Sequence, residues 1–170
     1  MSSSSSSILP FDPRRKYRYY ISTAANTVTG NAPDFEIILD RQRLSIPDTE
    51  RGKCIVCLQS ATLQGPNVTD TYLIRSDLPT VNVADNLDKP LRHLGTVSDL
   101  NYTKTESGVT SNYFSFHNAQ SLADSGVLCS NPFDHSVRFM VTDSEGVKVG
   151  TVTELSMVLD IQFKIGRAHV

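Results

Sequence analysis

The feature that most constrains the fold is an alternation of apolar and polar residues near the end of the chain. Val137, Phe139 and Val141 alternate with Arg138, Met140 and Thr142, which is the period of a strand with one buried face. Residues 155–163 repeat the pattern with five apolar side chains on one face: Leu155, Met157, Leu159, Ile161 and Phe163. An apolar sheet face must be covered, and almost no other segment reads as a long helix. We therefore expect a second sheet as the cover.

A short turn follows the first of these two strands. Asp143-Ser144-Glu145-Gly146 places a glycine where a tight turn usually requires a positive φ. The sequence therefore predicts a hairpin in which the strand at 137–142 and the strand at 155–163 form an antiparallel pair.

The rest of the chain consists of short apolar segments separated by turn residues. Strands are predicted at 16–22, 34–40, 54–63, 71–75, 93–97 and 109–117, with a short edge strand at Leu128. The most apolar of them, Cys54–Leu63, is expected at the centre of a sheet, and Asn101–Gly108 is expected to be a polar loop. Arg41–Gly52 is expected to form a loop or a single helical turn. About eight short strands indicate an all-β sandwich or barrel.

Composition divides the chain into an arm, a body and a tail. Residues 1–15 are expected to form a flexible Ser-rich arm, residues 16–164 the β-sandwich, and residues 165–170 a tail whose sequence looks non-native. Five arm residues are candidates for contacts with a neighbouring subunit: Ile8, Leu9, Phe11, Arg14 and Arg15. The two arginines also fit a solvated strand start.

Charge and targeting features exclude several classes of protein. The chain has 16 Lys and Arg against 18 Asp and Glu, which argues against a broad basic face for nucleic acid. No apolar run approaches the roughly 20 residues of a membrane span. Met1 is followed by six serines, without the charged and apolar regions of a signal peptide, so we expect a protein that is not secreted by that route.

The residues that could carry chemistry are scattered. Cys54 and Cys57 lie three apart within a predicted strand, so they should point to opposite faces and not form a joint metal or redox site. With Cys129 they make three cysteines, which is not a disulfide framework and fits small buried side chains. The histidines are isolated, and no nucleophile, phosphate-binding or metal motif is present. We expect no enzyme, cofactor, metal site or small-molecule substrate.

Three segments carry a resemblance to a known family. They are Asp34–Leu39 followed by Cys54–Leu63; Tyr72–Pro79 leading to Leu94–Val97; and Asn131–Phe133 followed by Val137–Asp143, Gly146 and the last strand. Together, over residues 34–163, they resemble the single jelly-roll minor capsid or penton proteins of large eukaryotic DNA viruses, virophages and polinton-like viruses. Val141 stands where the family pattern has leucine.

The resemblance implies both a fold and a role. The fold would be a single jelly-roll β-sandwich of about eight antiparallel strands in two facing sheets. The protein would be a structural virion component without a cofactor, assembled in the host cytoplasm or nucleus. Its partners would be copies of itself in a ring, for which a pentamer is one size, and the major capsid protein.

A second hypothesis belongs to a different class. A β-sandwich can act alone as a binding module for carbohydrate or for a receptor, and exposed aromatic side chains on one face would favour that role. The candidate residues are Tyr19, Tyr20, Tyr72, Tyr102 and Tyr113. Because aromatic residues are common in strands, we expect most of these five to be core or strand-filling residues.

Overall fold

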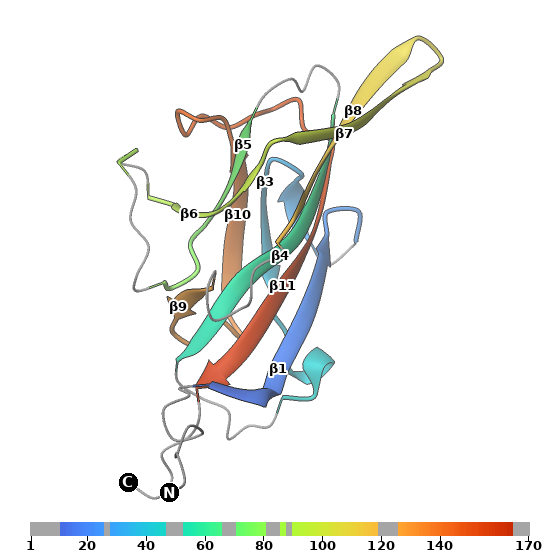
Figure 1. The fold of residues 1–170 in the computed structure, drawn as a ribbon. Helices are drawn as coiled ribbons and strands as arrows, with labels where there is room; N and C mark the ends of the chain where they lie inside the picture. The colour runs from blue at the N-terminus through green and yellow to red at the C-terminus, as the bar shows by residue number, and fades with distance from the viewer. Residues whose placement is uncertain are drawn as a thin grey trace, which may run out of the picture.

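The computed structural model describes residues 11–25, 28–46, 53–65, 71–80, 86–87, 90–118 and 126–164, with the backbone alone at 11–15, 99, 101 and 164. Two antiparallel sheets face each other (Figure 1). The first sheet has the order β1 (Phe11–Ser22), β11 (Glu154–Lys164), β4 (Cys54–Gly65), β8 (Val109–His117) and β7 (Asp99–Glu106), and β9 (Val127–Cys129) also pairs with β4. The second has the order β2 (Thr29–Asn31), β3 (Asp34–Ile38), β10 (Ser136–Thr142), β5 (Tyr72–Ser76) and β6 (Arg92–Val97).

The strand order is that of a jelly roll. In the first sheet the first strand pairs with the last, and β4 and β8 follow; in the second, β3 pairs with β10, and β5 and β6 follow. The chain thus crosses repeatedly between two four-stranded antiparallel layers, as two interlocked Greek keys require. Strands β2, β7 and β9 are additions to this framework. The predicted all-β jelly-roll sandwich is confirmed.

The core consists of the inner faces of the two sheets. The alternation in the last third of the chain is confirmed, because the apolar residues of β10 and β11 are buried: Val137, Phe139, Val141, Leu155, Met157, Leu159, Ile161 and Phe163. Phe139 stacks on Phe35 with ring centroids 5.5 Å apart. Burial of these side chains supplies the main favourable term for folding.

The predicted pairing of the last two long strands is wrong. β10 pairs with β3 and β5, whereas β11 pairs with β1 and β4, so the two strands lie in opposite sheets. The predicted turn does form, with Gly146 at a φ of 82° and an isolated bridge between Thr142 and Lys148. Residues 147–153 then carry the chain to the other sheet. Both apolar faces are buried by facing each other across the core, which needs no shared hydrogen bonds.

The segment predicted as a polar loop at Asn101–Gly108 is mostly strand. Residues 99–106 form β7, which pairs with β8 through a two-residue turn at Ser107 and Gly108 with φ values of 51° and 78°. Figure 1 shows this hairpin projecting beyond the sandwich. Most of its side chains are exposed on both faces, so its sequence lacks the apolar alternation from which strands are recognised.

Shorter elements agree better with expectation. The 3-10 helix η1 (Arg41–Leu44) supplies the predicted helical turn, capped by the Asp40 side chain, which accepts a hydrogen bond from the Gln42 N–H. β9 forms around Leu128, and β4 lies at the centre of its sheet between β11 on one side and β8 and β9 on the other. The segments at 47–52 and 119–125 lie outside the described residues.

An ion pair on the outer face of the second sheet gives a pH-dependent contribution to stability. Arg138 donates from Nε and Nη2 to the two carboxylate oxygens of Asp34, both at 2.8 Å. These hydrogen bonds lower the pKa of the Asp34 carboxyl in the folded state. The contribution is therefore fully present above the unfolded-state value of about 3.9 and is lost as the pH falls through the lower folded-state pKa.

We expect Asp34→Asn to remove part of this pH dependence. Because the pair is partly exposed, the loss of stability at neutral pH should be about 1 kcal/mol or less. Urea unfolding between about pH 5 and pH 2 should show a shallower decline for the variant. Glu106→Gln, which removes an exposed carboxyl of the hairpin, should keep the wild-type slope. Parallel curves for wild type and Asp34→Asn would contradict the prediction.

Candidate functional site

Three of the five predicted arm residues, Phe11, Arg14 and Arg15, lie within β1. β1 begins at Phe11, which is opposite Lys164, so the strand starts before the expected boundary at residue 16. Arg14 and Arg15 lie where the register between β1 and β11 shifts, between Phe11 and Lys16. Ile8 and Leu9 lie outside the described residues, as does the tail at 165–170.

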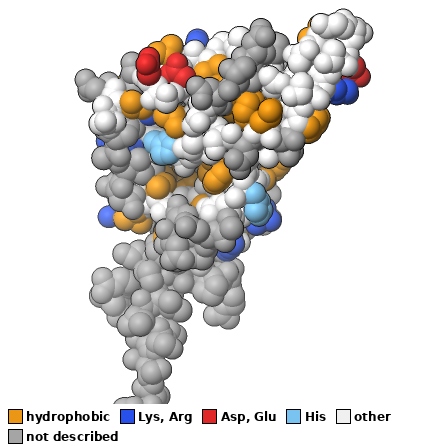
Figure 2. All heavy atoms as spheres, turned by 45° about the horizontal axis from the view of Figure 1, so that its top comes forward, with side chains coloured by type: hydrophobic (Ala, Val, Ile, Leu, Met, Phe, Trp, Pro, Cys, Tyr) orange, Lys and Arg blue, Asp and Glu red, His pale blue; other side chains and the backbone are white. Residues whose placement is uncertain are grey.

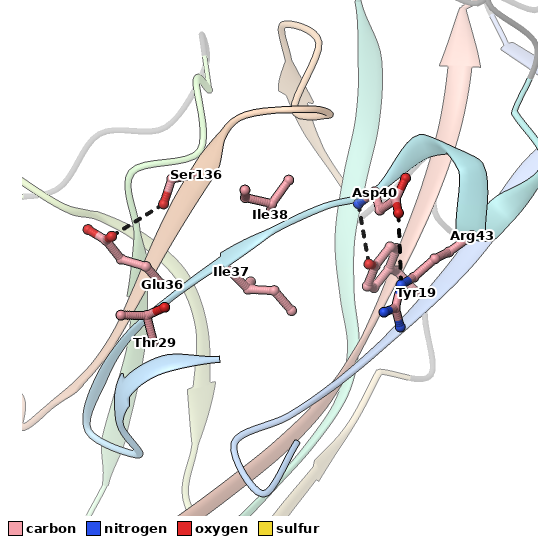
Figure 3. A pocket seen from close by; sticks show the side chains of 8 residues that line it. All are labelled: Tyr19, Thr29, Glu36, Ile37, Ile38, Asp40, Arg43 and Ser136. Atoms are coloured by element: carbon pink, nitrogen blue, oxygen red, sulfur yellow. Dashed lines mark hydrogen bonds and ion pairs between the residues drawn. The ribbon is translucent and has the colours of Figure 1, made fainter. Parts of the chain in front are cut away.

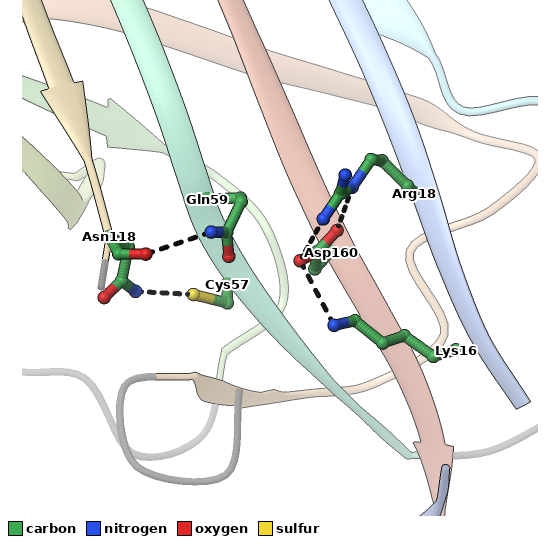
Figure 4. A network of polar contacts seen from close by, with 6 residues as sticks. All are labelled: Lys16, Arg18, Cys57, Gln59, Asn118 and Asp160. Atoms are coloured by element: carbon green, nitrogen blue, oxygen red, sulfur yellow. Dashed lines mark hydrogen bonds and ion pairs between the residues drawn. The ribbon is translucent and has the colours of Figure 1, made fainter. Parts of the chain in front are cut away.

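A charged cluster covers the outer face of the first sheet beside β1. Asp160 is only 1% exposed, although it points away from the core. Arg18 reaches it from β1 with Nε 2.9 Å from Oδ1 and Nη2 3.3 Å from Oδ2 (Figure 4). Lys16 Nζ lies 3.5 Å from Oδ2. Two cations from one strand thus satisfy a buried carboxylate on the next, as a buried charge requires.

The cysteines take the positions that strand geometry predicts. Cys54 faces the core opposite Cys129 of β9, whereas Cys57 lies on the outer face, where the Asn118 Nδ2–H donates to its Sγ at 3.0 Å (Figure 4). None of the three thiols forms a disulfide, and all three are buried. Within the described residues, no three His, Cys, Asp or Glu side chains gather in a way that could hold a metal ion.

The thiols should be protected in the folded protein. The hydrogen bond with Cys129 and then burial raise the pKa of the Cys54 thiol, and the thiolate is the reactive form. We expect a thiol-specific disulfide reagent at pH 8 to react with the native chain about a hundredfold more slowly than with the chain in urea, because access requires opening of the fold. All three thiols should react with the reagent once the chain is unfolded. Rapid native reaction of one thiol would contradict the packing of β4 and β9.

A groove of about 410 Å³ lies at the open edge between β1 and β3. Its walls include Tyr19, Ile37 and Ile38, with Asp40 and Arg43 at one end (Figure 3). Most polar groups there bind each other: the Asp40 N–H donates to the Tyr19 hydroxyl at 3.3 Å, and Arg43 Nε lies 4.0 Å from Asp40 Oδ2. The groove offers an apolar wall for contact rather than a prepared pair of nucleophile and base.

The five candidate tyrosines separate into two groups. Tyr19 and Tyr72 are buried in the core, whereas Tyr20 is 64% exposed on β1. Tyr102 and Tyr113 stack on each other across β7 and β8, with centroids 4.3 Å apart. Strand registers place Tyr20, Tyr102 and Tyr113 on the outer face of the first sheet.

The β7–β8 hairpin is a second exposed surface. Leu100, Tyr102 and Val109 are all more than half exposed. Figure 2 shows hydrophobic side chains gathered where the hairpin leaves the body, with charged side chains farther out. The polar run Asn101–Gly108 predicted a loop and not a strand, so the projecting hairpin was not expected, although Tyr102 and Tyr113 were candidates for exposed aromatic residues.

The described histidines are not brought together. His117 and His135 are exposed on different strands or loops, and His93 Nε2 lies 3.4 Å from Thr96 Oγ1 within β6. His169 lies outside the described residues. The features that the described structure offers for function are therefore strand edges, the groove and the hairpin.

No protein-family model matches this chain, and no curated protein matches it. Among the described residues there is no helix with the length and hydropathy needed to cross a bilayer.

Proposed function

We propose that this protein is a structural subunit of a virus capsid, a penton-type or minor capsid jelly roll. The observation that carries the proposal is the strand order, in which β1-β11-β4-β8 faces β3-β10-β5-β6. This is the architecture implied by the resemblance in residues 34–163. Because a fold alone hosts many functions, the surfaces must also support the role, and here they do: a hairpin with exposed Leu100, Tyr102 and Val109 projects from the sandwich.

The mechanism is assembly without catalysis. A rigid sandwich presents edges and loops to neighbouring subunits, which form a ring, and to the major capsid protein. A ring of more than two copies needs heterologous contacts, in which one patch binds a different patch on the next copy. The site of action is the virion, and no cofactor or small-molecule substrate takes part.

The arm provides the direct test of this role. Deletion of residues 1–10, which precede β1, should shift the protein from oligomer to monomer in sedimentation velocity, because Ile8 and Leu9 would bury apolar surface against a neighbour. The melting temperature of the monomer should not fall. Deletion of Ser2–Ser7 is the matched control and should leave the oligomer intact. An unchanged oligomer after the longer deletion would reject a role for the arm.

The second candidate function is a stand-alone binding module for carbohydrate or a receptor. The exposure of Tyr20 and Tyr102 on one outer face favours it, since aromatic rings can stack on sugars. The two functions differ in solution: a discrete ring supports the capsid role, and a monomer retained by immobilised glycan supports the module. Tyr20→Ala should weaken that retention if the module is correct.

A further inference from the structure

We propose that subunits join by pairing the free edge of β1 in one copy with the free edge of β7 in the next. This inference rests on the assembly role proposed above and names the surface that performs it. β1 and β7 are the two ends of the first sheet, and within the described residues each pairs on one side only. A strand edge presents unpaired N–H and C=O groups that another strand can satisfy.

The backbone groups that face outward from β1 can be identified. The Thr23 N–H donates to the Leu155 carbonyl at 3.0 Å, so this pair is of the hydrogen-bonded type. Because the direction of the N–H and C=O groups alternates along a strand, those of Ile21 also point toward β11, and those of Arg18 and Tyr20 point away from it. The free edge of β1 is therefore centred on Arg18 and Tyr20.

The outward-facing backbone groups of β7 follow from the pairing of β8 with β4 and β7. The Asn118 N–H donates to the Gln59 carbonyl at 2.8 Å. Counting back by twos from Asn118, every second residue of β8 therefore points its N–H and C=O groups toward β4, and the residues between them, including Tyr113, point theirs toward β7. Tyr102, opposite Tyr113, thus points its backbone toward β8. Thr103 and Thr105 point theirs outward, in agreement with the two-residue turn that closes the hairpin.

Charged side chains on both edges pair within their own sheet, and on β7 Lys104 Nζ lies 3.2 Å from Glu106 Oε1. Charged residues on an edge strand usually discourage pairing, but Lys16 and Arg18 are drawn across their own sheet to Asp160. Exposed apolar side chains flank both edges, Tyr20 on β1 and Leu100 and Tyr102 on β7. The hairpin stands clear of the sandwich (Figure 1), so it can reach a neighbour without collision of the two bodies.

The two edges also match in length and direction. The regularly paired part of β1, residues 16–22, extends about 23 Å, and β7, residues 99–106, about 26 Å. Each strand of the first sheet is antiparallel to its neighbours, so β1 and β7 run in the same direction. Copies in a common orientation therefore meet with these strands parallel. The contact is heterologous, and it forms a closed ring if the rotation between successive copies closes. A second copy is the partner that we infer, because in a ring of identical copies every β1 edge and every β7 edge is paired.

Proline substitution tests the pairing because proline cannot donate the outward hydrogen bond but is tolerated on an edge strand. Tyr20→Pro disables the β1 edge, and Thr103→Pro disables the β7 edge. Tyr20→Ala and Thr103→Ala are matched controls that remove the same side chains and keep the N–H groups. Sedimentation velocity measures the assembly state, and thermal melting confirms that each variant is folded.

We expect each proline variant to associate at least roughly tenfold more weakly than its alanine control. A one-to-one mixture of the two proline variants should form a dimer and nothing larger, because it contains one intact β1 edge and one intact β7 edge. Proline variants that assemble as well as wild type would overturn edge pairing while the capsid role stands. A wild-type chain that stays monomeric, or a mixture that stays monomeric, would also overturn it.

Discussion

Phe139→Ala is expected to lower the free energy of unfolding by about 3–5 kcal/mol, a large part of the 5–15 kcal/mol of a typical domain. Phe139 is fully buried on the inner face of β10 and stacks on Phe35. Removal of the ring would leave a cavity between the sheets, because strands on both sides hold the surrounding backbone. Urea denaturation followed by circular dichroism measures the loss.

The control for this substitution is an exposed apolar residue. Val147, which is 54% exposed after the turn that follows β10, should tolerate alanine with a change of about 0.5 kcal/mol or less. If Phe139→Ala cost no more than Val147→Ala, the two sheets would not pack against each other as described.

The second large effect is expected where Gly95 of one sheet lies close to Leu58 of the other. A Cβ on Gly95 of β6 would overlap Cδ2 of Leu58 on β4. Leu58 is buried, so it cannot turn into solvent, and overpacking of this kind costs about 1–3 kcal/mol. We expect Gly95→Ala to lower the urea midpoint accordingly, whereas Gly150→Ala, with open space around it, should be nearly neutral.

A double-mutant cycle separates steric overlap from other effects at Gly95. Leu58→Ala alone should cost about 2–5 kcal/mol through the cavity that it creates. In the double variant the added methyl group has room, so the cost of Gly95→Ala should vanish and the two effects should not add. Additive costs would show that Gly95 is required for its backbone conformation and not for the contact with Leu58.

Local sequence patterns predicted the strands that line the core, because the alternation within each strand indicates which of its side chains are buried. The alternation in residues 155–163 predicted which side chains of β11 point inward, and the spacing of Cys54 and Cys57 predicted opposite faces. The pairing of strands within each sheet could not be predicted from these local patterns. Nothing local to Val137 or Leu155 shows that their strands belong to opposite sheets, since a face is equally well buried by either arrangement.

The features of the candidate surfaces depend on contacts between distant segments. Asp160 has the sequence position of an exposed residue, and its burial follows only from the pairing of β11 with β1, which brings Arg18 alongside. Arg75 is fully buried, and its Nη2 donates to the Leu91 carbonyl. The β7 strand projects from the body, so its composition is that of a solvated segment. The arm residues remain predictions from sequence.

The pairing of β1 with β11 also determines when the protein can finish folding. Tyr19 lies opposite Leu159, so the first strand meets its neighbour only after some 140 intervening residues have been made. Contacts this distant in sequence are slow to form because a long loop must close. On the ribosome, β1 would wait unpaired until nearly the whole sandwich has emerged. We therefore expect the native sheet to be completed only after β11 has been synthesised. Until then, the unpaired β1 would depend on chaperones or on delayed collapse of the nascent chain.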